Sequence, residues 1–593
     1  MADAARDDDG YADLRSYAAI GDGRTVALIA ADGRIDWLPL PNLHSRPVFA
    51  ALLDAPSGGH LVLRPVGPFT VERAYAERTN VLVTTFRTDT GTVRVTDSMN
   101  TGVAGRLPWA ELARRVEGIT GEVELLAEVH PGTCLNTAAP WSSQTSAGPV
   151  LRIGRLTMAV RTLGVDDITT RDRAITGRIT TSSGSRHLFA LVATDREPLM
   201  LPDPESIDAG IDRTIENWQT WSATFRWDGA WADVVLRSAL ALKLLIYAPT
   251  GALAAAATTS LPESLSGAKN WDYRYAWTRD SAYALTALFR FGLREETHGA
   301  ISWLLATIRR HGPDPRILYN LDGSIPDDQV DVRDVPGWRG VGPVVSGNQA
   351  RGQLQLGVFG DLFSIVRLYV DEGNVLDAET GRMLADVADS TCDAWRSPDS
   401  GMWELPEEQH YVTSKMGCWK ALTDAAHLAE VGQLAGDAQR WTAEAELIRD
   451  WIDEYGWSEE RGAYVWYRGS DELDASVVLH AISGYDRGLR MQRTLDAVRA
   501  ELGAGPHLYR FTGAPDEEAT FVACSFWMVS ALHLTGRTDE AHALLTQLVE
   551  DVPNDVGLMA EMLDPDTGDF LGNLPQALSH LALIHAAISL AEE

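Results

Sequence analysis

The sequence predicts an N-terminal antiparallel β-sandwich followed by an all-helical domain. Roughly the first 200 residues form short apolar segments bounded by Gly, Asp, Asn and Pro, which is typical of strands joined by turns. After the Pro-rich stretch 199–206, apolar residues recur three and four positions apart, which is the helical period. About twelve such segments follow, separated by long loops, which favours a ring of helical hairpins in two concentric layers over a bundle.

Strand segments are expected in the first part of the chain because apolar and polar residues alternate there. Two of the segments contain a DG or TG turn between alternating runs, which predicts β-hairpins. The expected strands lie within residues 25–40, 59–65, 80–99, 121–131, 155–163 and 186–194.

A linker helix is expected at 207–225, and we place the domain boundary near Phe225. The predicted domains are therefore residues 1–225, the sandwich with its linker helix, and residues 226–593, the helical domain. The helices expected in the second domain are 231–248, 281–292, 295–311, 360–373, 380–397, 414–432, 438–456, 474–485, 493–503, 519–536, 539–550 and 576–593.

Composition excludes several classes of partner. A chain of 593 residues with 45% hydrophobic and 23% charged residues is typical of a globular protein of two or three domains. A net charge of −32 argues against nucleic acid, which needs clustered Lys and Arg. No segment is long and apolar enough to predict a membrane span, and the acidic N-terminus has no secretory pattern. We expect a cytoplasmic protein. The sequence does not indicate its oligomeric state, and a homo-oligomer is one of the alternatives.

No metal or cofactor is expected. The four cysteines are widely spaced, so we interpret them as reduced core residues, and no Cys or His spacing typical of a metal site occurs. A glycine loop of the phosphate-binding kind is also missing from the sequence.

The segment NWDYRYAWTRDS, residues 270–281, is the strongest candidate for a binding site. Aromatic rings such as Tyr273 and Trp277 cover sugar faces, and the adjacent Arg279 and Asp280 can bind neighbouring hydroxyls. An equally weighted alternative is an aromatic turn packed on a core helix with an ordinary surface ion pair.

Two loop carboxylates, Glu404 and Glu561, are candidates for glycosidic bond hydrolysis. That reaction needs one protonated carboxyl for the leaving oxygen and one ionised carboxylate on the other side. Each of the two is flanked by apolar residues. The alternative is that both are ordinary surface carboxylates, since most of the 83 acidic residues in the chain must be solvated. From these residues alone, the surface alternative is favoured over a catalytic pair.

The chain resembles glycoside hydrolase family 15, which groups glucoamylases, glucodextranases and trehalase-like bacterial enzymes. The resemblance rests on segments that occur in the family's order, and it implies a β-sandwich followed by an (α/α)6 barrel. The matching segments are SYAAIGDGRTVALIAADGRIDWLPLPNLHSRPVFAALLD, AAATTSLPES, NWDYRYAWTRDS, MWELPEEQHYVTSKMGCWKAL, LDASVVL, LYRF with EEATFVACSFWMV, and GDFLGNLPQALSHLALI.

Roles for individual residues follow from this resemblance. It implies that Glu404 is the general acid and Glu561 the general base. The resemblance also implies that Arg279, Asp280, Arg510 and Trp403 bind substrate. We further expect substrate binding by Tyr273 and Trp277, from their aromatic rings, and by Trp338, which is kept in the loop that helps to shape the site in the family.

The sequence departs from the family in two places. Met562 follows the base where many bacterial relatives have a second acid. In the loop 337–356, Gly342 and Val345 replace two arginines, so the side of the site that binds the leaving group is altered.

We therefore expect an inverting, exo-acting α-glucosidase that releases β-glucose from short α-glucosides or α-glucans. A trehalase of the same family is the alternative. Because the loop 337–356 is altered, we expect α-1,4 or α-1,6 glucosides to be better substrates than trehalose. A disaccharide phosphorylase or a non-catalytic carbohydrate-binding protein is less favoured because both candidate acids are present.

Overall fold

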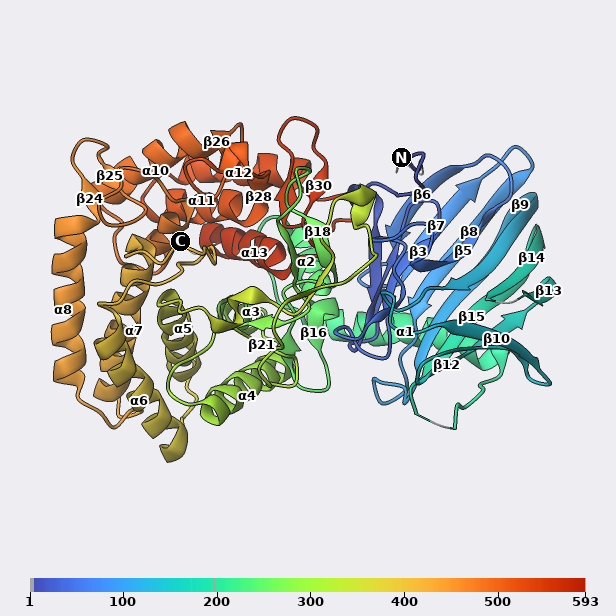
Figure 1. Ribbon diagram of the computed structural model, residues 1–593, viewed down its shortest axis with the longest axis horizontal. Helices are drawn as coiled ribbons and strands as arrows, with labels where there is room; N and C mark the ends of the chain where they lie inside the picture. The colour runs from blue at the N-terminus through green and yellow to red at the C-terminus, as the bar shows by residue number, and fades with distance from the viewer. Residues whose placement is uncertain (1–4, 172, 197, 592–593) are drawn as a thin grey trace.

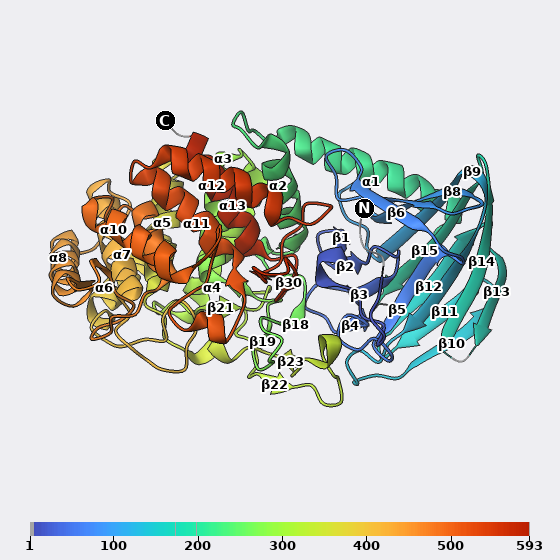
Figure 2. The same cartoon turned by 90° about the horizontal axis from the view of Figure 1, so that it is seen from above.

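The computed structural model describes residues 5–171, 173–196 and 198–591 (Figure 1). An N-terminal part of antiparallel strands is followed by a C-terminal part of helices, as the sequence predicts. Helix α1 (Pro204–Thr224) connects the two and contacts strands of the N-terminal part (Figure 2). The first helix of the C-terminal part, α2, begins at Ala232.

Strand β9 (Ala110–Pro131) organises the N-terminal part because its 22 residues are shared by two sheets. Its first half pairs with β8 (Gly91–Met99) and β15 (Arg186–Thr194). Its second half pairs with β5 (Gly59–Pro65) and β14 (Ala174–Ser182). Nearly all side chains are buried in its first half, whereas buried side chains alternate in its second half.

The two sheets are antiparallel throughout the described pairs. One has the order β1-β2-β3-β5-β9-β14-β13 and the other the order β6-β7-β8-β9-β15-β12-β11-β10. Strand β1 contacts β7 and β8, which brings the two sheets against each other. The remaining strands are β1 (Ala18–Gly21), β2 (Val26–Ile29), β3 (Ile35–Pro39), β4 (Pro47–Phe49, beside β3), β6 (Thr70–Tyr75), β7 (Leu82–Arg87), β10 (Pro140–Thr145), β11 (Gly148–Ile153), β12 (Leu156–Leu163) and β13 (Asp166–Arg171).

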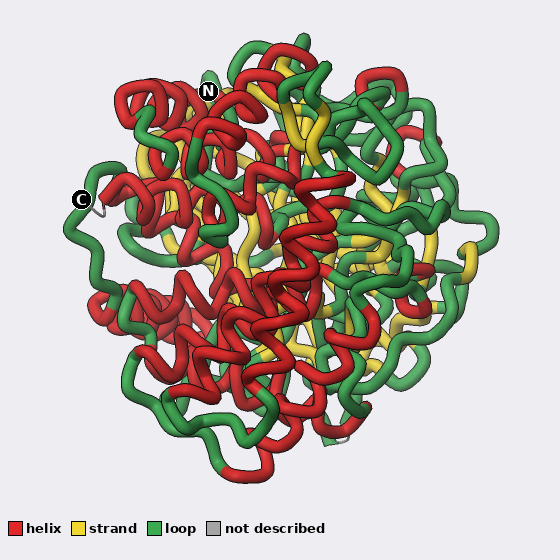
Figure 3. Tube along the Cα trace, turned by 90° about the vertical axis from the view of Figure 1, so that its left-hand side faces the viewer, coloured by secondary structure: helices red, strands yellow, loops and turns green. Residues whose placement is uncertain are grey.

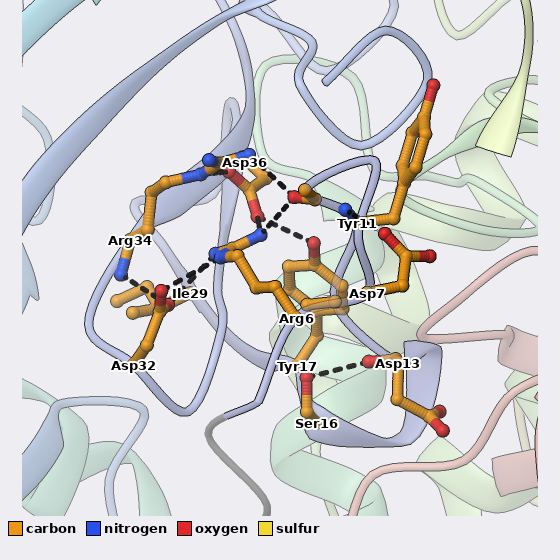
Figure 4. Close-up of polar contacts among 12 residues, drawn as sticks. Arg6, Asp7, Tyr11, Asp13, Ser16, Tyr17, Ile29, Asp32, Arg34 and Asp36 are labelled. Carbon is orange, nitrogen blue, oxygen red and sulfur yellow. Dashed lines mark hydrogen bonds and ion pairs between the residues drawn. The ribbon is translucent and has the colours of Figure 1, made fainter. Parts of the chain in front are cut away.

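A buried charge cluster fastens the beginning of the described chain to strands β2 and β3 (Figure 4). The Arg6 guanidinium donates to Asp32 at 2.8 and 2.9 Å and to Asp36 at 3.0 Å. The Tyr17 hydroxyl donates to Asp36 at 2.6 Å. Buried carboxylates are stable only when they are paired and hydrogen-bonded, so these contacts hold the N-terminal segment in one place.

Six helical segments of the C-terminal part form a closed inner ring. Figure 3 shows the molecule from the side of this helical part. Neighbours contact each other around the ring, and its last member contacts its first. Most side chains of these segments are buried, as expected for helices covered on all sides. In order they are α3 (Thr278–Arg290), α5 (Gly357–Asp371), α7 (Val412–Glu430), η4 with α9 (Ala475–Val478 and Leu479–Ile482), α11 (Val522–Leu534) and α13 (Ala577–Ala591).

The alternate helices lie outside this ring and are amphipathic. In α8, for example, only Trp441, Ala445, Ile448 and Ile452 are buried, on one face. The outer helices are α2 (Ala232–Leu245), α4 (Arg294–His311), α6 (Ala378–Ala394), α8 (Ala438–Tyr455), α10 (Leu489–Leu502) and α12 (Thr538–Asp551).

Every helical segment expected from the sequence is present among the described residues, although one is shorter than expected. The last two residues of the expected segment 576–593 lie outside the described residues. The segment 474–485 forms only the 3₁₀ turn η4 and the single α-helical turn α9. Gly484 follows at a φ of 80°, a left-handed conformation that ends a helix and that glycine adopts without strain.

Side chains from both parts of the chain tie them together. The Trp37 indole donates to the Ala257 carbonyl at 2.9 Å, and Asn80 donates to the Leu240 carbonyl at 2.9 Å. Arg73, whose side chain is fully buried, forms an ion pair with Asp555. These contacts join the two parts, and the buried apolar side chains of both parts belong to one hydrophobic cluster.

Candidate active site

A cavity of about 800 Å³ lies where the inner helices begin. Arg279 and Asp280 come from the first turn of α3, Phe521 immediately precedes α11, and Gln576 immediately precedes α13. The loops before the inner helices therefore supply its walls. Aromatic and polar side chains also line it, including Trp271, Tyr273, Trp277, Trp403, Trp466, Phe511, Glu263, Lys269, Asn348, Gln349, Gln353, Glu404, Arg510, Glu517 and Glu561.

Glu404 is held in the loop before α7 by two neighbours. The Trp277 indole donates to its carboxylate at 2.7 Å, and the Gln353 amide donates to its backbone carbonyl at 2.9 Å. Its backbone φ is 61°, an uncommon left-handed conformation for a residue other than glycine. Strain of this kind is often found at functional sites, where the surrounding contacts maintain it.

The pKa of the Glu404 carboxyl is raised above its ordinary value. Burial is the largest cause, because it disfavours the charged form, while Arg279 and the hydrogen bond from Trp277 oppose the shift. A carboxyl with a raised pKa retains its proton at higher pH, which is the property a general acid needs.

Glu561 is buried, with 1% of its surface exposed, and immediately precedes β29 (Met562–Leu563). Its Oε2 is buried and has no hydrogen-bond partner among the described residues. Gly572, at a φ of 71°, leaves room for this carboxylate: a Cβ on Gly572 would lie 2.6 Å from Glu561 Oε2. Glu561 thus lines the cavity with its Oε2 packed against Gly572.

Burial raises the pKa of Glu561 well above its ordinary value, and the nearby carboxylate of Glu263 raises it further. Arg510 and the Tyr273 hydroxyl act in the opposite direction because they stabilise the charged form. Glu404 and Glu561 thus lie in different environments within one cavity.

Arg510 is held between two buried carboxylates. Its guanidinium donates to Glu263 at 2.8 Å and also to Glu518. It lies over the ring of Trp403, 5.5 Å from the centroid, and the Trp403 indole donates to Asp474 at 2.8 Å. These contacts fix both the arginine and the aromatic ring that the sequence identifies as substrate-binding.

Arg279 and Asp280 form the ion pair that the sequence suggests. The Arg279 Nε donates to Asp280 Oδ1 at 2.9 Å, and its Nη1 donates to the Met402 carbonyl at 3.3 Å. Arg279 and Met402 also line a second cavity, of about 320 Å³, among the inner helices. Asp361 lies in that second cavity, and burial raises its pKa to about 7.

The structure brings eight of the nine predicted site residues to the larger cavity. They are Glu404, Glu561, Arg279, Asp280, Trp403, Arg510, Tyr273 and Trp277. Trp338 is not among the described residues that line it. Its indole is 2% exposed, donates to the Ala12 carbonyl at 3.1 Å, and stacks under the guanidinium of Arg339, so it joins the two parts of the chain.

The altered loop does not place its two substituted positions in the cavity. Val345 is buried, and its backbone N–H donates to the Ser260 hydroxyl at 2.8 Å. The Gly342 carbonyl accepts a hydrogen bond from the Ala268 backbone N–H at 3.5 Å. Other polar side chains, those of Lys269, Asn348, Gln349 and Gln353, line the cavity.

Sequence reasoning missed Glu263, which is buried beside Glu561. It lies within the family segment AAATTSLPES, and its partner Glu518 lies within EEATFVACSFWMV, but neither pattern specifies a role. Only the fold shows that Arg510 joins these two segments, which are more than 250 residues apart.

Within residues 5–171, 173–196 and 198–591, no group of three or more His, Cys, Asp or Glu side chains could hold a metal ion. The helices of the same residues include none that is long and apolar enough to cross a membrane.

Comparison with known proteins places the chain among glycosidases. Residues 229–588 match the family described as Glycosyl hydrolases family 15, and residues 12–131 match the domain described as Trehalase-like, N-terminal. A relative from Thermoplasma volcanium, named trehalase, is 30% identical over 98% of this chain and 94% of its own. A relative from Mycobacterium tuberculosis, also named trehalase, is 32% identical over 97% of this chain and 89% of its own.

The fold is similar to that of a bacterial glucoamylase crystallised with acarbose. The two structures align with a TM-score of 0.72 over 100% of this chain and 96% of the glucoamylase chain. At 12% sequence identity this similarity supports the fold alone.

Proposed function

This chain belongs to glycosyl hydrolases family 15 and is a glycoside hydrolase, and we propose that its preferred substrate is α,α-trehalose. The observation that carries the substrate is the similarity, over nearly the whole chain, to relatives named trehalase. This reverses the preference for α-1,4 and α-1,6 glucosides that the altered loop suggests from sequence. We also infer that the two rings of helices form the family's (α/α)6 barrel.

Glu404 acts as the general acid in this proposal. It delivers its proton to the glycosidic oxygen, and the carboxylate that results accepts the hydrogen bond from the Trp277 indole. Because a hydrogen bond to a charged acceptor is stronger than one to a neutral acceptor, Trp277 stabilises the carboxylate as charge develops on it.

Glu561 acts as the general base. Its carboxylate, which lines the cavity, accepts a proton from a water molecule that attacks the anomeric carbon from the side opposite the leaving group. The reaction therefore inverts the configuration of that carbon. For such a mechanism we expect the two carboxyl groups to be roughly 6.5–9.5 Å apart, which leaves room for the water.

Arg279 and Asp280 hold the glucose unit that is transferred to water. Both belong to the first turn of α3 and face the cavity, where they provide a donor and an acceptor for neighbouring hydroxyls. Trp403 and Trp277 supply aromatic surface, and Arg510 supplies a further charged donor.

The second glucose unit is proposed to bind Lys269 and Gln349. The amide of Gln353 already donates to the Glu404 backbone, and its Oε1 has no hydrogen-bond partner among the described residues. This oxygen is buried, so we assign the hydrogen bonds to the leaving sugar to Lys269 and Gln349. In this way the cavity provides donors and acceptors although Gly342 and Val345 lie outside it.

Specificity constants for trehalose, maltose and isomaltose test the substrate. We expect kcat/KM for trehalose to exceed the other two by about tenfold or more, which corresponds to roughly 1.4 kcal/mol of transition-state discrimination. Equal or higher values for maltose or isomaltose would exclude trehalose as the preferred substrate. Activity that depends on added phosphate would identify a phosphorylase instead.

A matched pair of variants tests the two roles. Glu404→Gln and Glu561→Gln remove one carboxylate each and conserve volume, and we expect each to lower kcat by about two or more orders of magnitude. With α-glucosyl fluoride, whose leaving group needs little protonation, Glu404→Gln should keep most of its activity and Glu561→Gln should not. Equal losses on this substrate would contradict the assignment.

A further inference from the structure

The hairpin 330–346 lies next to the part of the cavity that is proposed to bind the second glucose unit. Its two strands, β22 (Val330–Asp331) and β23 (Val345–Ser346), pair antiparallel over two residues each. A two-stranded hairpin is at best marginally stable in water, so this one needs contacts with other parts of the chain to keep its position. None of its residues lines the cavity, so it can act on a substrate only through its neighbours.

Toward the cavity, the hairpin contacts the two segments that carry the proposed ligands of the second glucose unit. The Val341 carbonyl accepts a hydrogen bond from the Asn270 side chain at 3.1 Å, and Asn270 directly follows Lys269. Gln349 comes shortly after β23. Its backbone N–H donates to the side chain of Gln329, which directly precedes β22, at 3.3 Å. The position of the hairpin therefore affects where Lys269 and Gln349 lie in the wall of the cavity.

On its other side, the tip of the hairpin is bonded to the N-terminal part of the chain. Figure 2 shows β22 and β23 where the helical part meets the N-terminal part. The Tyr11 hydroxyl donates to the Gly337 carbonyl at 3.1 Å, and the Trp338 indole donates to the Ala12 carbonyl at 3.1 Å. Both of these hydrogen bonds are buried, whereas those from Asn136 to two carbonyls of the hairpin are exposed. Because hydrogen bonds are stronger away from water, the two buried ones are the main anchors of the tip.

The N-terminal residues that hold the tip are themselves fixed. The buried charge cluster around Arg6 holds the beginning of the described chain on β2 and β3. Arg6 forms a β-bridge with Ala12, and the Tyr11 backbone N–H donates to the Asp7 side chain at 2.8 Å. Figure 4 shows the ring of Tyr11 directed away from the Arg6 cluster. The Tyr11 hydroxyl and the Ala12 carbonyl are therefore firm points of attachment for the hairpin.

We propose that Tyr11 and Trp338 are positioning residues for the leaving sugar: they hold the hairpin 330–346 in place, and the hairpin places Lys269 and Gln349 for the second glucose unit. The inference rests on the proposed function, in which Lys269 and Gln349 bind that unit. It gives the N-terminal part of the chain a role in substrate selection in addition to its contribution to stability. Trp338 acts on the substrate through the backbone of the hairpin and does not touch it.

The test compares a substrate that has a leaving sugar with one that has none. Trehalose places its second glucose unit at Lys269 and Gln349, whereas the leaving group of α-glucosyl fluoride is a single atom. The double variant Tyr11→Phe/Trp338→Phe removes both buried hydrogen bonds and keeps an aromatic ring at each position. We expect kcat/KM for trehalose to fall by about 5- to 30-fold and kcat/KM for α-glucosyl fluoride to change by less than about twofold. The change for trehalose should come mainly from KM, because contacts with the leaving sugar are lost from the bound substrate and the transition state alike.

Asn80→Ala is the matched control. It removes another buried hydrogen bond between the two parts of the chain, the one to the Leu240 carbonyl at 2.9 Å on α2, and leaves the contacts of the hairpin intact. The ratio of the two specificity constants should stay within about twofold of the wild-type ratio in this variant.

Hydrogen–deuterium exchange provides a measurement that is independent of activity. The backbone amides of Val332 and Val341 are hydrogen-bonded within the hairpin. In the double variant they should exchange about fivefold faster or more, whereas in Asn80→Ala they should exchange as in the wild type.

The proposal is overturned if the double variant keeps the wild-type ratio of specificity constants, if it loses equal activity on both substrates, or if Asn80→Ala shifts the ratio as strongly. If the double variant does not fold, the single variants replace it, and each should shift the ratio in the same direction. A wild type that hydrolyses maltose better than trehalose would refute the proposed substrate, but the same fall in the ratio measured with maltose would still support the role of the hairpin. A wild type inactive on all three substrates would refute the proposed function and this inference together.

Discussion

Replacing Trp277 with phenylalanine removes the indole N–H that donates to Glu404 at 2.7 Å while keeping an aromatic ring in the wall of the cavity. Among the described residues, no other side chain donates a hydrogen bond to this carboxylate. A hydrogen bond to a charged group contributes about 1.5–3 kcal/mol, and it is fully formed only after Glu404 has given up its proton. The bond therefore stabilises the transition state more than the ground state.

The loss of this bond should lower kcat by about 10- to 150-fold, the range that corresponds to those energies. It should also change the pH dependence. The bond from Trp277 lowers the pKa of Glu404 because it favours the charged form, so its removal raises that pKa further. Since the acid is active while protonated, the alkaline limb of kcat/KM should move to higher pH.

The assay is the pH profile of trehalose hydrolysis by the wild type and by Trp277→Phe, with α-glucosyl fluoride as a control. On the fluoride, which needs little help from the acid, the variant should lose much less activity. An alkaline limb that stays in place or moves to lower pH would refute the reasoning. An equal loss on both substrates would show that Trp277 acts by packing alone.

Three further predictions address the base, the sugar site and the joint between the two parts of the chain. Gly572→Ala should lower kcat, because the added Cβ would lie 2.6 Å from Glu561 Oε2. It should also lower the free energy of unfolding by about 1 kcal/mol, because alanine is strained at the φ of 71° that Gly572 adopts. Steady-state kinetics and thermal unfolding measure the two effects. Asp280→Asn should impair hydrolysis of trehalose, maltose and α-glucosyl fluoride alike, because all three place the same glucose unit at Arg279 and Asp280; a defect limited to long chains would contradict this site. Trp37→Phe should destabilise the protein by about 1–3 kcal/mol in urea unfolding by leaving the Ala257 carbonyl without its indole partner, and unchanged stability would show that this bond contributes little.

Periodicity predicts the elements of this fold well where side chains alternate between core and solvent. Strand β5 (Gly59–Pro65) is bounded as expected, and α3 forms where apolar residues recur at helical spacing. Strand β13 (Asp166–Arg171) was not predicted, because its side chains are exposed or half-buried and carry little apolar signal. The first half of β9 was not predicted either, since Arg114 and Arg115 interrupt its apolar pattern and are buried only through ion pairs with Asp97 and Asp208.

The site was predicted by resemblance more than by pattern. Glu404 and Glu561 could be given roles because the family resemblance implies them, but the sequence does not indicate that Glu263 lies beside Glu561. The position of Trp338 also depends on tertiary contacts, because a tryptophan in a loop can face either the sugar or another part of the chain. Here its indole bonds the Ala12 carbonyl in the N-terminal part, which no spacing in the chain could indicate.

The anomers formed from trehalose test the central claim most directly. Attack of water with inversion converts one glucose unit to β-glucose, while the other leaves as α-glucose, so ¹H NMR in the first minutes should show equal amounts of the two anomers. In water enriched in ¹⁸O, the label should appear only in the β-anomer. Initial formation of α-glucose alone would indicate retention and would contradict the role of Glu561 as a base that activates water.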